Sequence, residues 1–416
     1  GNIGSTVSYC QMSDDDASSS AAAIAAVAEM LGAGRVTTLL MLNVNPAYDA
    51  PASLDFAARM SKATTITLAV DANETESVST WSLNGTHYLE SWGDTVAADG
   101  TLSPVQPMIA PIYAPAHSDI ELMAMLAGES ATDGHDIVKD VWKTLVGDSD
   151  KVWRRALHDG VSPKPVFAAG AWPPDMAAIA EAARRLSIGP APSKDSLDVS
   201  FATGRMHDGR FANYAWLQEL PATGTMVVWD NPALVSPATA RALDLEPVGF
   251  SESDPSRMYT KPKYPHARVA TLTIGGRAMQ VPVWILSGMA DNTVIVHQGY
   301  GRRVCGHVGG SEADPVGFND AAIRPTGAAR VASGGKLASA GGTYLIASTQ
   351  NHWSMESRTA IVRAVDLAAW RKFGDVPPVL EKDHIYANTS KELSFAEKLG
   401  ELGHTPPNIG IYDNPY

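Results

Sequence analysis

Polar side chains that could bind a ligand follow three expected strands near the start of the sequence. Asn43-Val44-Asn45-Pro46 follows one strand, Asp71 to Thr75 follows the next, and His87 to Asp94 follows an apolar stretch. Open α/β sheets bind ligands at the carboxyl ends of their strands, so these side chains could hydrogen-bond a base or a ribose. The same residue types also cap turns and helix starts, and capping is the alternative interpretation.

Two His/Glu pairs have the spacing of neighbours on a helix. His87 and Glu90 are three residues apart, and His352 and Glu356 are four apart. A catalytic zinc needs three protein ligands, and no third ligand accompanies either pair. We therefore expect these side chains to form hydrogen bonds, and we predict no metal site.

The candidate nucleophiles lack the surroundings that would activate them. Ser354 lies close to His352, but no Gly-x-Ser-x-Gly elbow surrounds any serine. Cys305 lies near two arginines and His307, which could lower the pKa of its thiol. A buried, unreactive thiol is the alternative. The sequence therefore predicts no catalytic residue.

Composition excludes several classes of protein. The 416 residues predict two or three domains, and 45% hydrophobic with 19% charged residues is typical of globular chains. The formal charge of −13 disfavours nucleic acid and anionic membranes as partners. Two cysteines cannot supply a four-thiolate cluster. No apolar run of about 18 residues occurs, so we expect no membrane span, and residues 1–5 predict no signal peptide.

Strands and helices are expected to alternate over residues 1–130. Residues 21–31 are alanine-rich and predict a helix, and Pro51 is expected to open another helix that continues to Met60. The β-prone runs are 6–10, 36–42 and 64–70, the second apolar enough to be buried on both faces. This alternation predicts an α/β domain with a doubly wound parallel sheet.

The remainder is predicted to be helical at first and then mostly β. Residues 131–198 form a helical excursion and linker, with helical periodicity over 137–157 and a helix over 176–186. Residues 199–416 form a β-barrel-like domain with a helix over 361–373 and a polar tail. Residues 301–342 contain ten glycines, so much of this range is expected to be loop. The predicted strands are 225–229, 293–296, 343–347 and a hairpin of 268–274 and 277–286 around Gly275-Gly276.

Longer strings resemble a known family when they are taken together. They are 43–52 (NVNPAYDAPA), 73–76 (NETE), 87–94 (HYLESWGD), 99–113 (DGTLSPVQPMIAPIY), 153–160 (WRRALHDG), 216–221 (WLQELP), 229–240 (WDNPALVSPATA), 299–303 (GYGRR) and 348–358 (STQNHWSMESR). As a set, they are similar to the molybdopterin-oxidoreductase-like half of the large iron–sulfur subunit of alternative complex III. The resemblance covers residues 1–414, although Ser53 stands where the family has an acid.

The resemblance implies a particular architecture and role. The chain would be the second α/β domain and the C-terminal β-barrel domain of the molybdopterin-like half. Iron–sulfur clusters would lie in the adjoining ferredoxin-like part, outside this chain. The complex oxidises quinol, and its partners would be a multihaem cytochrome and quinol-binding membrane subunits. The location would be the periplasmic side of the bacterial inner membrane, without a membrane span of this chain.

The resemblance also indicates where a pterin would bind. Asn43 stands where many molybdoenzymes place a glycine, and no Arg or Lys lies between Arg35 and Arg59. An anionic dinucleotide usually needs such groups, so we expect no bound cofactor and a non-catalytic scaffold. The alternatives are a fragment of a pterin-binding molybdoenzyme, such as a polysulfide-reductase-like oxidoreductase, and a free-standing small-molecule-binding protein. If pterin is bound, the residues would be Asn43, Asn45, Pro46, Asp71, Glu74, Thr75, Asp291 and Asn292.

Overall fold

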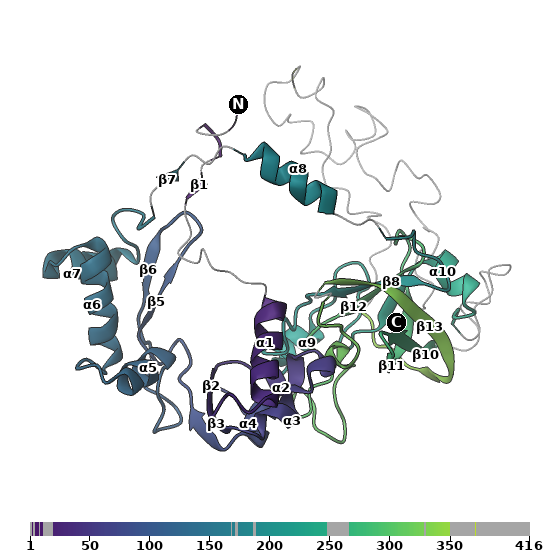
Figure 1. Ribbon diagram of the computed structural model, residues 1–416, viewed down its shortest axis with the longest axis horizontal. Helices are drawn as coiled ribbons and strands as arrows, with labels where there is room; N and C mark the ends of the chain where they lie inside the picture. Colours follow the sequence, from purple (N-terminus) through teal and green to yellow (C-terminus); the bar gives the residue numbers. More distant parts are fainter. Residues whose placement is uncertain are drawn as a thin grey trace, which may run out of the picture.

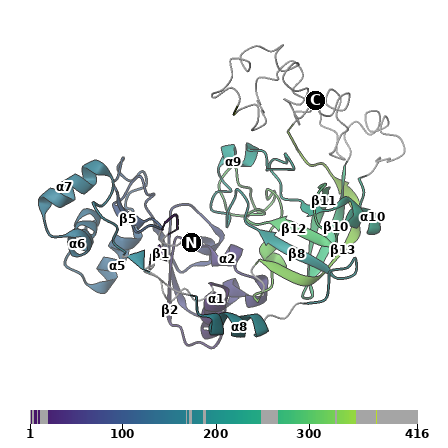
Figure 2. The ribbon, with the colours of Figure 1, turned by 90° about the horizontal axis from the view of Figure 1, so that it is seen from above.

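A computed structural model describes most of the chain up to residue 349. The described residues are 20–167, 174–185, 189–247, 266–327 and 330–349, with short pieces at 2, 5–7, 9–10, 169–170 and 371. A parallel sheet lies between a helical unit at one end and a β-barrel at the other (Figures 1 and 2). Several predictions lie outside the described residues. They are the pair His352/Glu356, Ser354, the polar tail and the helix over 361–373, of which only Arg371 is described.

Three parallel strands form the sheet of the N-terminal part. They are β2 (Thr38–Leu42), β3 (Thr64–Ala69) and β4 (Trp81–Asn84), paired in chain order. In β2 only Met41 is buried, so the prediction of burial on both faces is wrong. Leu39 and Met41 share one face of the strand, and both pack into the apolar cluster that includes Phe56 and Met60.

The first predicted helix is confirmed as α1 (Ser20–Gly32). Its alanines favour helix, and Ala28 is fully buried in the same cluster as Met60. Arg59 Nη1 and Lys62 Nζ donate hydrogen bonds to the carbonyls of Ala28 and Gly32, at 2.9 and 2.8 Å. The Gly32 carbonyl lies in the last turn of α1, where the helix itself supplies no donor, so the bond from Lys62 satisfies it.

The helix predicted from Pro51 to Met60 is divided in the structure. Helix α2 (Pro46–Asp49) ends before Pro51, a 3-10 turn spans Ala52–Leu54, and α3 spans Phe56–Met60. Asp55, between the last two, has φ 48°, in the left-handed region that interrupts a right-handed helix. Pro46 rather than Pro51 takes the first-turn position.

A hairpin and three helices form a second unit with its own apolar cluster. The elements are β5 (Gly93–Val96), β6 (Leu102–Val105), α5 (Asp119–Ala127), α6 (Gly134–Val146) and α7 (Asp150–Asp159). The rings of Trp142 and Trp153 lie 5.7 Å apart, edge to face, between α6 and α7. The helical periodicity of 137–157 is confirmed, whereas the domain boundaries at 130 and 198 stay predictions.

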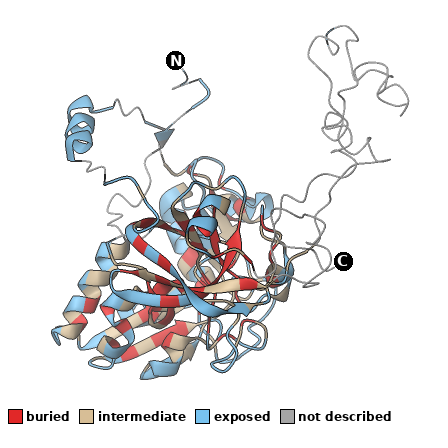
Figure 3. Ribbon diagram, turned by 90° about the vertical axis from the view of Figure 1, so that its right-hand side faces the viewer, coloured by how far each residue is buried: buried red, intermediate tan, exposed pale blue. Residues whose placement is uncertain are grey.

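Six strands of the C-terminal part close into a barrel, in the order β10-β11-β9-β12-β8-β13. Buried positions gather along these strands (Figure 3). The strands are β8 (Leu197–Ala202), β9 (Ala233–Val235), β10 (Ala267–Ile274), β11 (Arg277–Ile285), β12 (Thr293–His297) and β13 (Val331–Tyr344). The segments between them include helix α10 (Pro237–Ala242) and a 3-10 turn at Asp320–Ala322. The predicted fold class, an α/β parallel sheet followed by a β-barrel, is confirmed.

The predicted hairpin around Gly275-Gly276 is also confirmed. Strand β10 ends at Ile274 and β11 begins at Arg277. Both glycines have positive φ, 55° and 78°, which a two-residue turn of this kind requires.

One other prediction for the barrel region is wrong, and two are confirmed in part. Residues 225–229 form no strand beyond an isolated bridge of Val227 to Ser348, because Met226 and Trp229 have left-handed φ angles of 58° and 62°. The prediction that much of residues 301–342 is loop is confirmed for the described residues up to 330, which form no helix or strand beyond a 3-10 turn and isolated bridges. It fails over 331–342, because β13 runs through the glycines there. The strand predicted over 343–347 contributes only its first two residues, as the end of β13.

Two smaller elements lie outside the main layers. Strand β1 (Tyr9–Cys10) pairs antiparallel with β7 (Ala169–Gly170), so the predicted N-terminal strand does not join the parallel sheet. Helix α8 (Met176–Arg185) buries none of its residues. Within the described part of the chain, no helix has the length and apolar character needed to cross a bilayer.

Candidate functional site

A cleft of about 870 Å³ opens at the carboxyl ends of the parallel strands. Its walls include Asn43, Asp71 and His87, which follow β2, β3 and β4 in turn. The opposite wall belongs to the barrel part, from 208–217 and from 302–306. The cleft therefore lies where an open α/β sheet is expected to bind a ligand.

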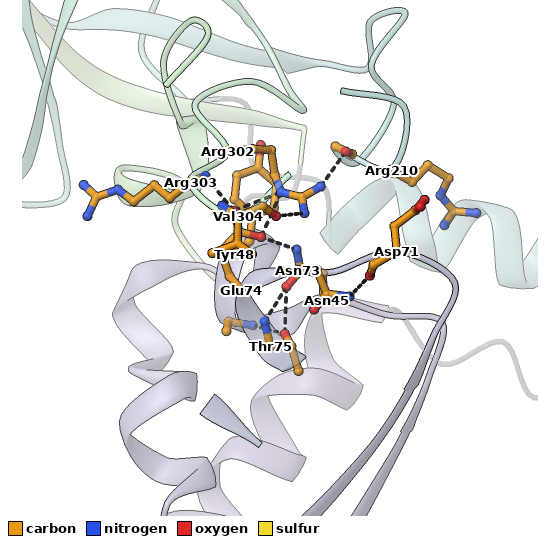
Figure 4. A network of polar contacts seen from close by, with 12 residues as sticks. Asn45, Tyr48, Asp71, Asn73, Glu74, Thr75, Arg210, Arg302, Arg303 and Val304 are labelled. Carbon is orange, nitrogen blue, oxygen red and sulfur yellow. Dashed lines mark hydrogen bonds and ion pairs between the residues drawn. The ribbon is translucent and has the colours of Figure 1, made fainter. Parts of the chain in front are cut away.

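Glu74 is the centre of a polar network behind this cleft (Figure 4). It begins α4 (Glu74–Val78), which the Asn73 capping box starts. Its carboxylate accepts hydrogen bonds from Arg302 Nε at 2.8 and 3.0 Å and from Asn45 Nδ2 at 2.7 Å. The backbone N–H groups of Arg303 and Val304 donate to the same carboxylate, at 2.7 and 3.1 Å. Two distant parts of the chain meet at this one side chain.

Arg302 donates a hydrogen bond to the protein from each of its three guanidinium nitrogens. Only 5% of it is exposed, and its guanidinium also donates to the carbonyls of Gly209 and Val304, at 2.7 and 2.8 Å. The guanidinium lies 5.0 Å from the centre of the Tyr48 ring. The Tyr48 hydroxyl donates to the Tyr300 carbonyl at 2.6 Å. This hydrogen bond and the Glu74–Arg302 pair both join the α/β part to the barrel part.

Asn45 and Thr75 hold the strand-end loops against each other. The Asn45 Oδ1 atom accepts from the backbone N–H of Thr75 at 3.0 Å and from its hydroxyl at 2.7 Å. The Thr75 hydroxyl oxygen accepts from the N–H of Ala47 at 3.0 Å. These side chains therefore use their hydrogen-bonding capacity within the protein.

The carboxyl groups around the cleft divide into two electrostatic types. Burial acts to raise the pKa of Glu74, but the hydrogen bonds and charge of Arg302 outweigh it, and the pKa lies below its ordinary value. Burial, followed by repulsion from Asp208, raises the pKa of Asp49 to about 7. Arg210 contacts both carboxylate oxygens of Asp208 at 2.7–3.1 Å and, against burial, lowers the pKa of Asp208 to about 2.

The cleft wall is acidic overall. Its two cationic side chains, Arg210 and Arg302, are each paired with a carboxylate. Among the described residues that line the cleft, no Arg or Lys is therefore left to neutralise an anionic ligand. The lining carboxyl groups are those of Asp49, Asp71, Asp94, Asp119 and Asp208.

The residues predicted for a pterin separate into three places. Asn43, Asn45 and Asp71 line the cleft. Pro46, Glu74 and Thr75 lie behind it, in α2 and in the network. Asp291 and Asn292 lie elsewhere, on the barrel beside α10, where Asp291 accepts from the Ser236 hydroxyl at 2.5 Å and the Asn292 N–H donates to Thr239 at 2.7 Å. The structure thus brings six of the eight together at the sheet edge.

The other sequence candidates take structural roles. Glu90 accepts hydrogen bonds from the backbone N–H groups of His87 at 3.0 Å and Ile112 at 3.1 Å, so it organises two loops. Cys305 lines the cleft, but burial raises the pKa of its thiol. Burial of Cys305 favours the interpretation as a buried, unreactive thiol, and the charge of Arg302 is already paired with Glu74.

Sequence reasoning missed Asp49 and the barrel residues of the cleft. Asp49 lies within the NVNPAYDAPA string, but no local pattern shows that Asp208 approaches it. The Asp208–Arg210 pair and Phe211 come from a segment more than one hundred residues away from the strand ends. No signal in the sequence indicated that they approach the strand ends, because residues 208–211 lie outside the strings that resemble the family.

Comparison with known proteins gives a structural likeness but no match of sequence. No protein family and no curated protein matches the sequence. Among solved structures, the chain is similar to acetylene hydratase from Pelobacter acetylenicus, at 13% identity and a TM-score of 0.49. The match covers 72% of this chain and 42% of that enzyme, so the chain spans less than half of its length. A likeness of this size carries no argument about function.

Proposed function

We propose that this chain is a non-catalytic, molybdopterin-oxidoreductase-like part of a quinol-oxidising respiratory complex, of the alternative complex III type. Its role is to brace an adjoining ferredoxin-like iron–sulfur part at electron-transfer distance from a multihaem cytochrome. The proposal includes quinol-binding membrane subunits as partners and a periplasmic location. The sequence strings and their resemblance to the large iron–sulfur subunit of that complex suggest this role.

The observation that carries the proposal is the pairing of both cleft arginines. A pyranopterin dinucleotide is anionic, and its phosphates need cationic side chains or free N–H groups. Arg302 already donates to Glu74, Gly209 and Val304, and Arg210 already binds Asp208. A phosphate in this cleft would instead meet the carboxyls of Asp49 and Asp71, so the residues present do not fit the group.

The test is a cofactor analysis of the full-length subunit purified with its partners. Molybdenum and tungsten are measured by mass spectrometry, and released pterin is measured by fluorescence after oxidation. We expect neither metal nor pterin at a level approaching one per chain, while iron from the clusters is detected in the same sample. One pterin per chain would overturn the proposal.

The second candidate is a fragment of a pterin-binding molybdoenzyme. The size of the cleft and its place at the strand ends favour it, since 870 Å³ accommodates a large ligand. The cofactor analysis separates the two candidates. Bound pterin would also require the side chains of Arg210 or Arg302 to leave their carboxylate partners.

A further inference from the structure

One continuous stretch of the chain carries most of its negative charge. Residues 63–138 contain eleven Asp and Glu and no Lys or Arg. The whole chain has a formal charge of −13, so the other residues are nearly balanced. The stretch includes β4, the hairpin and α5, and it reaches the rim of the acidic cleft at Asp71, Asp94 and Asp119.

The same stretch also exposes several large apolar side chains. Tyr88, Met108, Ile112 and Tyr113 are 65%, 76%, 68% and 74% exposed. Leu89 and Ile109 are exposed beside them. We call these six residues the apolar patch.

Hydrogen bonds hold the two segments of the apolar patch together. The N–H groups of Met108 and Ile109 donate to the Leu89 carbonyl at 2.7 and 3.1 Å. The Ile112 N–H donates to Glu90, which also receives the N–H of His87. The patch is therefore a fixed surface, and its exposed side chains are costly in water unless something covers them.

We propose that the apolar patch, with the carboxylates around it, is the docking surface for a partner protein with a Lys- and Arg-rich face. The inference rests on the proposed scaffolding role and adds the location of the contact. Charge complementarity selects the partner. Glu90 is hydrogen-bonded to the patch, and Asp94 and Asp119 line the same cleft as Tyr88. With no Lys or Arg over 63–138, these carboxylates attract basic side chains and repel nucleic acid and anionic lipid. Apolar anchors at the centre and charges at the rim are typical of protein interfaces.

The test places a photoreactive phenylalanine derivative at Met108 or Ile112 of the full-length protein in its source cells. After irradiation, cross-linked peptides are identified by mass spectrometry. We expect a peptide of another protein with net positive charge. The matched control is the same derivative at Leu345, which is 59% exposed on the barrel side and should give no such peptide.

A second measurement uses the partner identified in this way. Ile112→Ser with Tyr113→Ser should weaken its binding by roughly tenfold, and Leu345→Ser should leave it unchanged. Added salt should slow association with the unaltered protein. Cross-links within the same chain, to lipid, to an acidic peptide, or no more frequent than at Leu345 would overturn the inference. Pterin in the purified subunit would overturn the proposed function alone, because cross-linking does not depend on the cleft being empty.

Discussion

Buried carboxyl groups are the main residue-scale feature outside the cleft. Burial raises the pKa of Asp230 to about 7 and that of Asp320 to about 6. The Tyr344 hydroxyl donates to Asp230 Oδ2 at 3.0 Å, while Oδ1 has no hydrogen-bond partner among the described residues. Arg324 lies 3.5 Å from Asp320. Because the folded state raises these pKa values, ionisation of either carboxyl group lowers the stability of the fold, and this loss grows as the pH rises.

Asp230→Asn should therefore change how stability depends on pH. The folded pKa of Asp230 is about 7 and the unfolded one about 3.9, so the free energy of unfolding falls as pH rises between them. An Asn can still accept from Tyr344 and has no charge to desolvate. We expect the variant to be more stable than the natural protein by about 4 kcal/mol at pH 8 and by only about 1 kcal/mol at pH 4.5, in urea unfolding. Exposed Glu312→Gln is the control, and an equal gain at both pH values would contradict the assignment.

At the scale of elements, the loops that join the barrel to the sheet approach each other closely. Gly301 has φ +71°, and a Cβ there would lie 2.4 Å from the Asn319 backbone nitrogen. Asn319 Nδ2 in turn donates to the Tyr48 carbonyl at 3.4 Å. The GYGRR string therefore needs glycine at its centre for two separate reasons, the backbone conformation and the close approach.

Gly301→Ala should destabilise the protein by roughly 3 kcal/mol or more, because the backbone of the neighbouring loop must move. Gly341→Ala isolates the conformational part, since Gly341 has φ +75° with no atom within 4 Å of the added Cβ. We expect a loss of only about 1 kcal/mol there. Thermal unfolding of both variants measures the two losses of stability. If they are similar, the loop at Asn319 moves away from the added Cβ without loss of stability, and the close approach does not require glycine.

At the scale of the whole molecule, the Glu74–Arg302 pair joins the parallel-sheet part to the barrel. Burying two charges is costly, and it is offset here because Glu74 also accepts from Asn45, Arg303 and Val304. The contact spans 228 residues of sequence. It also pairs the charge of Arg302 within the protein, although Arg302 lines the cleft, and the same pair therefore supports both the assembly of the fold and the proposed absence of a pterin.

Glu74→Gln should destabilise the chain by about 3 kcal/mol, because Arg302 is left buried without its counter-charge. Asp208→Asn breaks an ion pair of Arg210 that is more exposed, so a loss of about 1 kcal/mol or less is expected. Denaturant unfolding of the two variants is the measurement. If Glu74→Gln costs no more than Asp208→Asn, the two parts of the molecule are held together by contacts other than this pair.

The sequence alone was sufficient for features that depend on neighbouring residues. Alanines over 21–31 predicted α1, and Gly275-Gly276 predicted the hairpin, because helix propensity and turn geometry are local. The alternation of strands and helices predicted a parallel sheet, and the strand ends Asn43 and Asp71 were correctly expected to lie at one edge. The same local reasoning failed at Met226 and Trp229, where tertiary packing imposes left-handed conformations.

Only the tertiary structure decided what the candidate side chains do. Asn45, Glu74 and Thr75 have the donors and acceptors of a binding loop, but their partners are Arg302, Ala47 and one another. Whether a polar group is free for a ligand depends on which distant group desolvates it and bonds to it, and chain spacing carries no record of that. The charge of residues 63–138 can be counted from the sequence. The proposal that this stretch forms a docking surface also required the structure, which shows that Tyr88 and Met108 are exposed.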